Sequence, residues 1–262
     1  MSAVDYDVEA ASPDRPLHQQ RYAAESAEIS ILGDDIDLSY GPDPAERLDI
    51  HWPEGKPRAA LMFFHGGYWR GGAKEPRRFI LKGFRGEGIA YVNIEYPLAP
   101  VASLTAIVES ARRAVAFAEA RVARRMGSVP IILSGNSAGA HLALMASDRV
   151  ANLAALVAIS GLYDLRPLTS RPQGEAVGLT DPMAEALSPR LLGLARTRPI
   201  LFTVGGNEPA AFVDQTIGYF RERLGGGTAD ALHVLAGHDH FSILGDFGRP
   251  GTLLTQATLS LV

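Results

Sequence analysis

The stretch Pro130-Ile131-Ile132-Leu133-Ser134-Gly135-Asn136-Ser137-Ala138-Gly139-Ala140-His141 decides the fold. A short apolar run, typical of a buried strand, meets a Gly-x-Ser-x-Gly core, and Ala- and Leu-rich helix residues follow at once. Strand, tight turn and helix in this order are the context of a nucleophile elbow, where a strained serine stands exposed at the strand end. Glycines two before and two after Ser137 remove the Cβ atoms that would collide in so tight a turn. The pattern predicts Ser137 as a nucleophile at the carboxyl end of a central strand.

Strand and helix patterns alternate on both sides of this stretch. Apolar runs at 59–64 and 153–159 are typical of strands covered on both faces, and 89–95 is expected as another buried strand. Apolar residues recur at helical spacing over 103–126. The remaining expected strands are 29–32, 47–52, 129–133, 200–204 and 231–235, and the remaining expected helices are 17–27, 76–86, 138–147, 209–224 and one at the C-terminus. The alternation predicts an α/β fold with a mostly parallel central sheet, helices on both faces, and a site at the carboxyl ends of the strands.

Length and composition favour one domain over residues 1–262. The chain is 47% hydrophobic and 21% charged, enough for a large core. Residues 1–15 are expected as a loose lead-in, and the irregular, proline-containing segment 164–198 as a small cap or lid over the site. A net charge of -4 gives no basic footprint for nucleic acid, and the absence of cysteine excludes disulfides and thiolate catalysis. No stretch reads as a signal peptide or membrane span, so a cytoplasmic protein without a membrane partner is expected.

A nucleophilic serine needs a histidine base, and in folds with a nucleophile elbow an acid and then the histidine follow the serine along the chain. The base is expected near the last strand, and the candidates there are His233, His238 and His240. His233 falls inside that strand, whereas the other two lie just past it. His240 is favoured over His238, with Phe241 packing behind it. A two-residue histidine spacing with no third ligand nearby is a weak metal signal, so neither a metal nor a cofactor is expected.

The acid is expected after the strand at 200–204, in Gly205-Gly206-Asn207-Glu208-Pro209. Glu208 can take the role because the imidazole needs only a charged acceptor for its N–H. Asp214 is the rival, although it falls a turn or more into the next helix. Asp164 also lies at a strand end, but one strand too early in the chain, and its expected role is to bond the amides of a turn.

The donors for a developing oxyanion are expected in His65-Gly66-Gly67-Tyr68-Trp69, which follows the strand at 59–64. The backbone amides of Gly67 and Tyr68, with that of Ala138 after the nucleophile, form the predicted oxyanion hole. The side chains of Tyr68 and Trp69 are expected to shape an acyl or aryl pocket. Two further histidines are expected to be structural: His65 would brace the loop and His141 would pack beneath the elbow.

Taken together, these motifs resemble the α/β-hydrolase superfamily and, more narrowly, its kynurenine formamidase (arylformamidase) branch. The resemblance covers the chain from about residue 17 to the end. It rests on His65-Gly66-Gly67-x-Trp69, the elbow 135–143, the stretch 160–168, the closing Asp239-His240-Phe241, and Tyr40-Gly41 ahead of 47–50. Related bacterial carboxylesterases share these motifs. Two departures stand out: Glu208 occupies a position that is normally aspartate, and Tyr68 replaces the third glycine of hormone-sensitive-lipase-like esterases.

The resemblance implies the α/β-hydrolase fold and a cofactor-free serine hydrolase that acts on a small aryl formamide or short-chain ester through an acyl-enzyme. A general short-chain carboxylesterase is the alternative, and a non-catalytic binding protein of the same fold is a third reading. Bulky Tyr68 and Trp69 would crowd the acyl side, while Tyr163, Phe241 and the cap would hold an aromatic leaving group. For a substrate carboxylate, Arg70 and Lys74 are the nearby cations. The expected partner is a small-molecule ester or amide, and a homodimer is compatible with the sequence.

Overall fold

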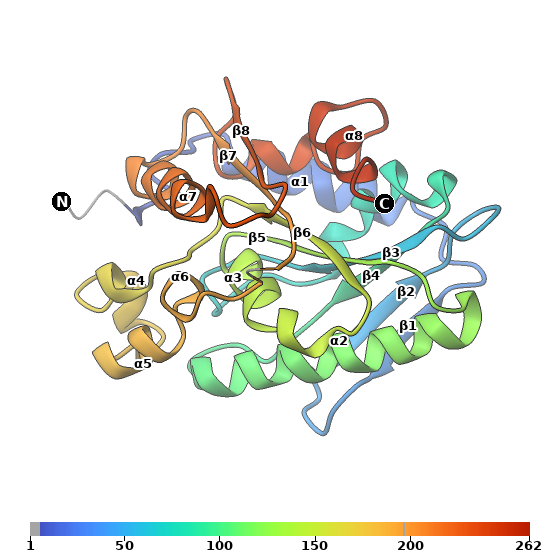
Figure 1. The fold of residues 1–262 in the computed structure, drawn as a ribbon, viewed down its shortest axis with the longest axis horizontal. Helices are drawn as coiled ribbons and strands as arrows, with labels where there is room; N and C mark the ends of the chain where they lie inside the picture. The colour runs from blue at the N-terminus through green and yellow to red at the C-terminus, as the bar shows by residue number, and fades with distance from the viewer. Residues whose placement is uncertain (1–5, 196) are drawn as a thin grey trace.

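The computed structural model describes residues 6–195 and 197–262, which build an eight-stranded sheet between layers of helices (Figure 1). The strands are β1 (Asp35–Ser39), β2 (Arg47–His51), β3 (Ala59–Phe64), β4 (Ile89–Ile94), β5 (Ile131–Asn136), β6 (Leu153–Ile159), β7 (Ile200–Gly205) and β8 (Ala231–Leu235). Their order is β1-β2-β4-β3-β5-β6-β7-β8. The β1–β2 and β2–β4 pairs are antiparallel and all other pairs are parallel, so the predicted sheet is confirmed.

Two hydrophobic layers cover the two faces of the sheet. One holds the helices α2 (Leu104–Met126), α3 (Ala138–Met145) and α7 (Ala210–Arg223), and the other holds α1 (Arg15–Ala27), the 3₁₀ helix η2 (Glu75–Gly83) and α8 (Leu253–Leu259). Figure 1 shows α2 below the sheet and α1 and α8 above it. In β3, Ala60, Met62 and Phe64 join the first layer, while Ala59, Leu61 and Phe63 join the second. Since successive strand side chains alternate between faces, a strand buried on both sides must read as a continuous apolar run.

Helix α2 begins where the sequence predicts. The side chain of Ser103 accepts a hydrogen bond from the Ala106 amide at 3.2 Å and caps the first turn. Its buried stripe includes Leu104, Ile107, Ala111 and Val115. These residues recur every three or four positions and therefore share the face that packs on the sheet.

Two predicted elements differ in the structure. Residues 29–32 form no strand, and Leu32 is 92% exposed; the edge strand β1 starts at Asp35 instead. The segment predicted as a helix over 76–86 is the 3₁₀ helix η2. Nine residues are too few for apolar spacing to separate a repeat of 3.0 from one of 3.6 residues per turn.

The segment 164–198 contains a 3₁₀ turn (Arg166–Leu168) and the short helices α4 (Pro172–Glu175), α5 (Asp181–Ala186) and α6 (Pro189–Leu192), which lie together beyond α3 in Figure 1; residue 196 is outside the described residues. Residues 6–14, expected as part of a loose lead-in, instead pack on the body of the protein, with Tyr6 and Val8 buried; residues 1–5 of that lead-in are outside the described residues. Within the described chain, no helix combines the length and apolar character that crossing a bilayer requires.

Candidate active site

Ser137 lies at the sharp turn between β5 and α3. Its backbone has φ 55° and ψ -122°, a left-handed conformation that costs an L-residue about 1–3 kcal/mol. A Cβ on Gly135 would overlap the Gly139 backbone, and a Cβ on Gly139 would overlap the carbonyl of Phe64. The Ser137 side-chain oxygen is buried and makes no hydrogen bond to any described residue, although Ser137 lines a pocket. The backbone therefore has the geometry of a nucleophile elbow.

His240 and Glu208 form a buried, hydrogen-bonded pair at the end of the sheet. The distance from His240 Nδ1 to Glu208 Oε2 is 2.6 Å, and the two residues are 3% and 8% exposed. Because a carboxylate only accepts, Nδ1 carries the proton toward Glu208, and Nε2 is left for another partner. His240 and Ser137 line the same pocket, so the structure brings together the three residues that the sequence predicts for catalysis.

Glu208 is held by more than His240. Its Oε1 accepts a hydrogen bond from Ser160 Oγ at 2.5 Å and another from the Gly205 amide at 2.7 Å. Ser160 directly follows β6 and has φ 50°, so it is a second strained residue beside the site. The sequence gives no separate signal for this contact, because Ser160 and Glu208 are 48 residues apart.

The rival residues lie elsewhere. Asp214 is exposed on α7, and His233 lies within the edge strand β8, as expected. His238 is outside the pocket that Ser137 and His240 line. Asp164 accepts a hydrogen bond from the Arg166 amide at 3.1 Å and pairs with the Arg166 guanidinium, which confirms its predicted place in a turn.

The loop after β3 carries the predicted oxyanion donors. Three consecutive residues of the loop have left-handed backbone: Gly67 with φ 126°, Tyr68 with φ 49° and Trp69 with φ 57°. Within the described chain, the amides of Gly67, Tyr68 and Ala138 donate to no acceptor. The adjacent Gly66 amide donates to Asn136 Oδ1 at 3.0 Å, a contact that ties the loop to the elbow. The sequence treats Asn136 only as the variable position of the motif.

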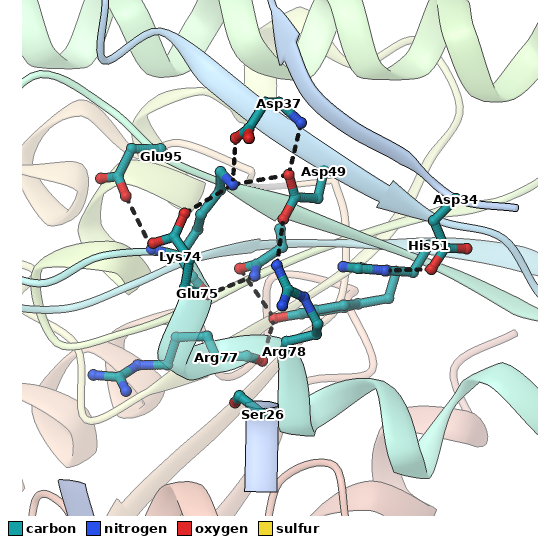
Figure 2. A network of polar contacts seen from close by, with 12 residues as sticks. Ser26, Asp34, Asp37, Asp49, His51, Lys74, Glu75, Arg77, Arg78 and Glu95 are labelled. Atoms are coloured by element: carbon teal, nitrogen blue, oxygen red, sulfur yellow. Dashed lines mark hydrogen bonds and ion pairs between the residues drawn. The ribbon is translucent and has the colours of Figure 1, made fainter. Parts of the chain in front are cut away.

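A polar network that includes Glu95 and Lys74 lies next to this loop in the chain (Figure 2). Glu95, which follows β4, accepts hydrogen bonds from His65 Nε2 at 2.8 Å and from the Lys74 amide at 2.9 Å. It therefore clamps both ends of the loop, and the predicted bracing role of His65 is confirmed. The two contacts join residues that are 30 and 21 positions apart in the sequence. They hold the two ends of the loop that carries the Gly67 and Tyr68 amides.

Lys74, considered for binding a substrate carboxylate, is buried and already paired. Its Nζ lies 2.8 Å from both Asp37 and Asp49 and 2.9 Å from Glu75 (Figure 2). These carboxylates raise the pKa of Lys74 above its ordinary value despite burial. The expectation for Lys74 is therefore wrong, because its ammonium group is paired with carboxylates of the protein itself.

We expect Lys74→Met to destabilise the protein by about 3–5 kcal/mol, because it removes the closest cation from buried Asp49. Among the described residues, Asp49 would keep the Asp37 amide at 2.9 Å and Arg78 at 3.4 Å. Urea unfolding measures the loss. The matched control is Lys82→Met, whose pair with Glu25 is partly exposed and worth about 0–1 kcal/mol. Equal losses in the two variants would contradict the structural role of Lys74.

The pocket at the site has a volume of about 310 Å³. One wall is the loop 66–72, a second is Phe241 with Leu244, and a third comes from Val8, Glu9 and Arg15 of the N-terminal segment. Tyr6 anchors that segment: its carbonyl accepts a hydrogen bond from Tyr68 Oη at 2.6 Å. The N-terminal segment, rather than the segment 164–198, supplies the wall, because no described residue of 164–198 lines the pocket.

Two aromatic residues expected in the pocket lie in the core. Trp69 is fully buried and donates from Nε1 to His141 Nδ1 at 3.2 Å. Tyr163 is fully buried against Phe202 and Tyr219. Tyr68 and Phe241 do line the pocket. Tyr68 and Trp69 belong to the loop after β3 and both have left-handed backbone, with φ 49° and 57°. The loop conformation therefore decides their directions: Trp69 packs in the core while Tyr68 lines the pocket.

His141 packs beneath the elbow, as predicted. Its Nδ1 accepts from Trp69 and its Nε2 donates to the Leu187 carbonyl at 2.8 Å. Burial lowers the pKa of His141 to about 4, so the ring is neutral near pH 7. The ring therefore links the elbow helix to the segment 164–198 as a structural group. Within the described residues, no cluster of three or more histidine or acidic side chains is arranged to hold a metal ion.

Comparisons with known proteins agree with this architecture. A family model described as BD-FAE matches residues 48–171. Kynurenine formamidase of Danio rerio is 28% identical over 241 residues, covering 87% of this chain and 81% of that protein. A crystal structure of a candidate thioesterase from Silicibacter sp. TM1040 superposes with a TM-score of 0.87 at 27% identity, covering 96% of each chain. The chain has the α/β-hydrolase fold.

A second solved structure supports the same fold for this hydrolase. A bacterial heroin esterase superposes with a TM-score of 0.69 at 22% identity, covering 97% of this chain and 90% of that one. The relatives of the hydrolase therefore include both formamidases and esterases.

Proposed function

We propose that this α/β hydrolase is a serine hydrolase that cleaves a small aryl formamide or a short-chain ester through an acyl-enzyme. The observation that carries the proposal is the strained, unbonded Ser137 in the pocket that also contains His240, itself paired with buried Glu208. Strain and buried polar pairs of this kind concentrate at functional sites.

In the proposed reaction, Ser137 Oγ attacks the carbonyl carbon while its proton passes to His240 Nε2. The oxygen that gains the negative charge accepts hydrogen bonds from the amides of Gly67, Tyr68 and Ala138. The intermediate collapses, the bond to the leaving group breaks, and His240 returns the proton to the departing amine or alcohol. Water then attacks the acyl-enzyme with His240 again as base. Glu208 holds the ring and stabilises its positive charge.

Two observations support a formyl or acetyl group as the acyl part. The kynurenine formamidases of Danio rerio and Salmo salar are 28% and 26% identical over most of the chain. In addition, Tyr68 lines the same pocket as Ser137, and its hydroxyl is fixed on the Tyr6 carbonyl, so a bulky side chain is held in the pocket wall. The alternative, a general short-chain carboxylesterase, is favoured by the esterases among the relatives.

The substrate is tested by measuring kcat/KM for p-nitrophenyl esters of increasing acyl length beside N-formyl-kynurenine. We expect formyl and acetyl groups to exceed butyryl and longer chains by about tenfold or more, since each misfit methylene is worth about 1–3 kcal/mol. Tyr68→Gly, which the left-handed backbone tolerates, should move the optimum toward longer chains. A wild-type maximum at six carbons or beyond would exclude the crowded acyl pocket. Fast esters without deformylation would select the carboxylesterase alternative.

A non-catalytic binding protein of this fold is the third reading, and labelling by a fluorophosphonate probe separates it from the two enzymes. We expect stoichiometric labelling of the wild-type protein that the Ser137→Ala variant loses. The proposal also keeps two predictions from the sequence, a cytoplasmic location and compatibility with a homodimer.

A further inference from the structure

The side chains that line the pocket include more arginines than carboxylates. Glu9, Arg15, Arg70 and Arg77 line it together with His240. Glu9 and Arg15 neutralise each other, with 2.5 Å between Glu9 Oε1 and Arg15 Nη1. Over residues 6–195 and 197–262, neither Arg70 nor Arg77 forms an ion pair with a carboxylate. The pocket therefore has two unmatched guanidinium groups.

Arg77 is the more unusual of the two because it is partly buried. Its Nε is inaccessible to solvent and has no hydrogen-bond partner among the described residues, and its Nη1 reaches only the Pro76 carbonyl at 3.4 Å. The ionisable groups that act on it are the phenols of Tyr22, Tyr91 and Tyr96, and burial lowers the pKa of the guanidinium.

The next residue in the chain shows the contrast. Arg78 contacts Asp49 at 3.4 Å, inside the network that also holds Lys74. Figure 2 shows the Arg77 side chain extending away from that network. Arg77 thus forms no ion pair with Asp49, which Arg78 contacts, and instead lines the pocket that Ser137 and His240 share.

A guanidinium withdrawn from water without a counter-charge is unfavourable, and its planar fork matches a carboxylate in two parallel hydrogen bonds. We propose that Arg77, with Arg70 at the exposed rim, forms an anion subsite that binds a carboxylate carried by the substrate. This inference rests on the proposed function and narrows its substrate class to anionic aryl formamides or esters. It also replaces Lys74 with Arg77 as the cation that meets the carboxylate.

The test compares substrates that differ only in this charge: 3- and 4-acetoxybenzoate against the corresponding acetoxybenzamides, at constant ionic strength. We expect the wild-type kcat/KM to favour at least one acid over its amide by about tenfold or more. Arg77→Gln should lower kcat/KM for that acid by about ten- to a hundredfold, mainly through KM, as expected for a charge-assisted hydrogen bond. The amides should change by less than about threefold, since they make no such bond.

Two further variants serve as controls. Arg77→Lys keeps the charge and should restore part of the preference for the acid. Arg21→Gln removes an equal charge from an exposed side chain of α1 that does not line the pocket, and should leave the preference unchanged. An equal loss on acids and amides in Arg77→Gln, or a wild-type enzyme with no preference for any acid, would overturn the anion subsite.

A binding measurement covers the case in which Arg77→Gln does not fold. Benzoate should inhibit hydrolysis of a neutral ester by the wild-type enzyme about tenfold more strongly than benzamide, and Arg70→Gln should weaken inhibition by benzoate alone. Equal inhibition by the two compounds would refute the subsite. Failure of the proposed function is distinct, because it would appear as undiminished turnover of acids and amides alike in Ser137→Ala.

Discussion

Replacement of Ser137 by alanine is expected to lower kcat by about 10⁴- to 10⁶-fold, the scale on which a triad serine contributes. The folded state should persist, because the Ser137 Oγ makes no hydrogen bond that the change would break. Alanine keeps the Cβ that the turn already accommodates at φ 55°. The measurements are kcat on p-nitrophenyl acetate and the thermal unfolding midpoint of each protein.

Ser147→Ala is the matched control for this variant. Ser147 follows α3, and its hydroxyl donates to the Leu144 carbonyl at 2.7 Å, outside the pocket. Its loss should cost about 1 kcal/mol of stability and leave kcat unchanged. If Ser137→Ala retained activity within about tenfold of the wild type, Ser137 would not be the nucleophile.

The second large effect is expected at the His240–Glu208 pair. His240→Ala should lower kcat by about 10⁴-fold or more, because His240 is the one histidine among the described residues that line the pocket. Glu208→Gln should lower it by about 10³- to 10⁴-fold: the amide can donate to the ring and so favour the wrong tautomer. The same variant exchanges the charged acceptor of Ser160 Oγ for a neutral one.

Two substitutions in the same part of the chain provide controls. His238→Ala changes a histidine two positions from His240, and Asp214→Asn changes an exposed acid on the helix after Glu208. Both variants should keep most of kcat. The reverse pattern, with large losses at His238 and Asp214 and small ones at His240 and Glu208, would refute the assigned base and acid but leave the fold unaffected.

Much of the architecture is predictable from the sequence because it depends on local patterns of apolar residues and glycines. Apolar runs such as 59–64 and 153–159 match β3 and β6 in full, since only strands buried on both faces need every side chain apolar. The elbow is predictable for the same reason: Gly135 and Gly139 stand where any Cβ would meet backbone. The parallel topology then places the ends of β5, β7 and β8 along one edge, so Ser137, Glu208 and His240 could be proposed together from their order in the chain.

The walls of the pocket were decided only by tertiary structure. Tyr6 and Val8 are two apolar residues in an acidic stretch, with no periodicity to mark them. Val8 lines the pocket, and Tyr6 anchors the segment through its contact with Tyr68, 62 residues away. Lys74 and Arg77 lie three residues apart in one basic segment. Lys74 cannot bind a substrate because it pairs with Asp37 and Asp49 of neighbouring strands. Arg77, in contrast, forms no ion pair with a carboxylate of the described residues. Local sequence therefore determined the elements and the order of the reacting groups. Which charges and aromatic rings face the substrate depended on long-range contacts, which spacing along the chain does not encode.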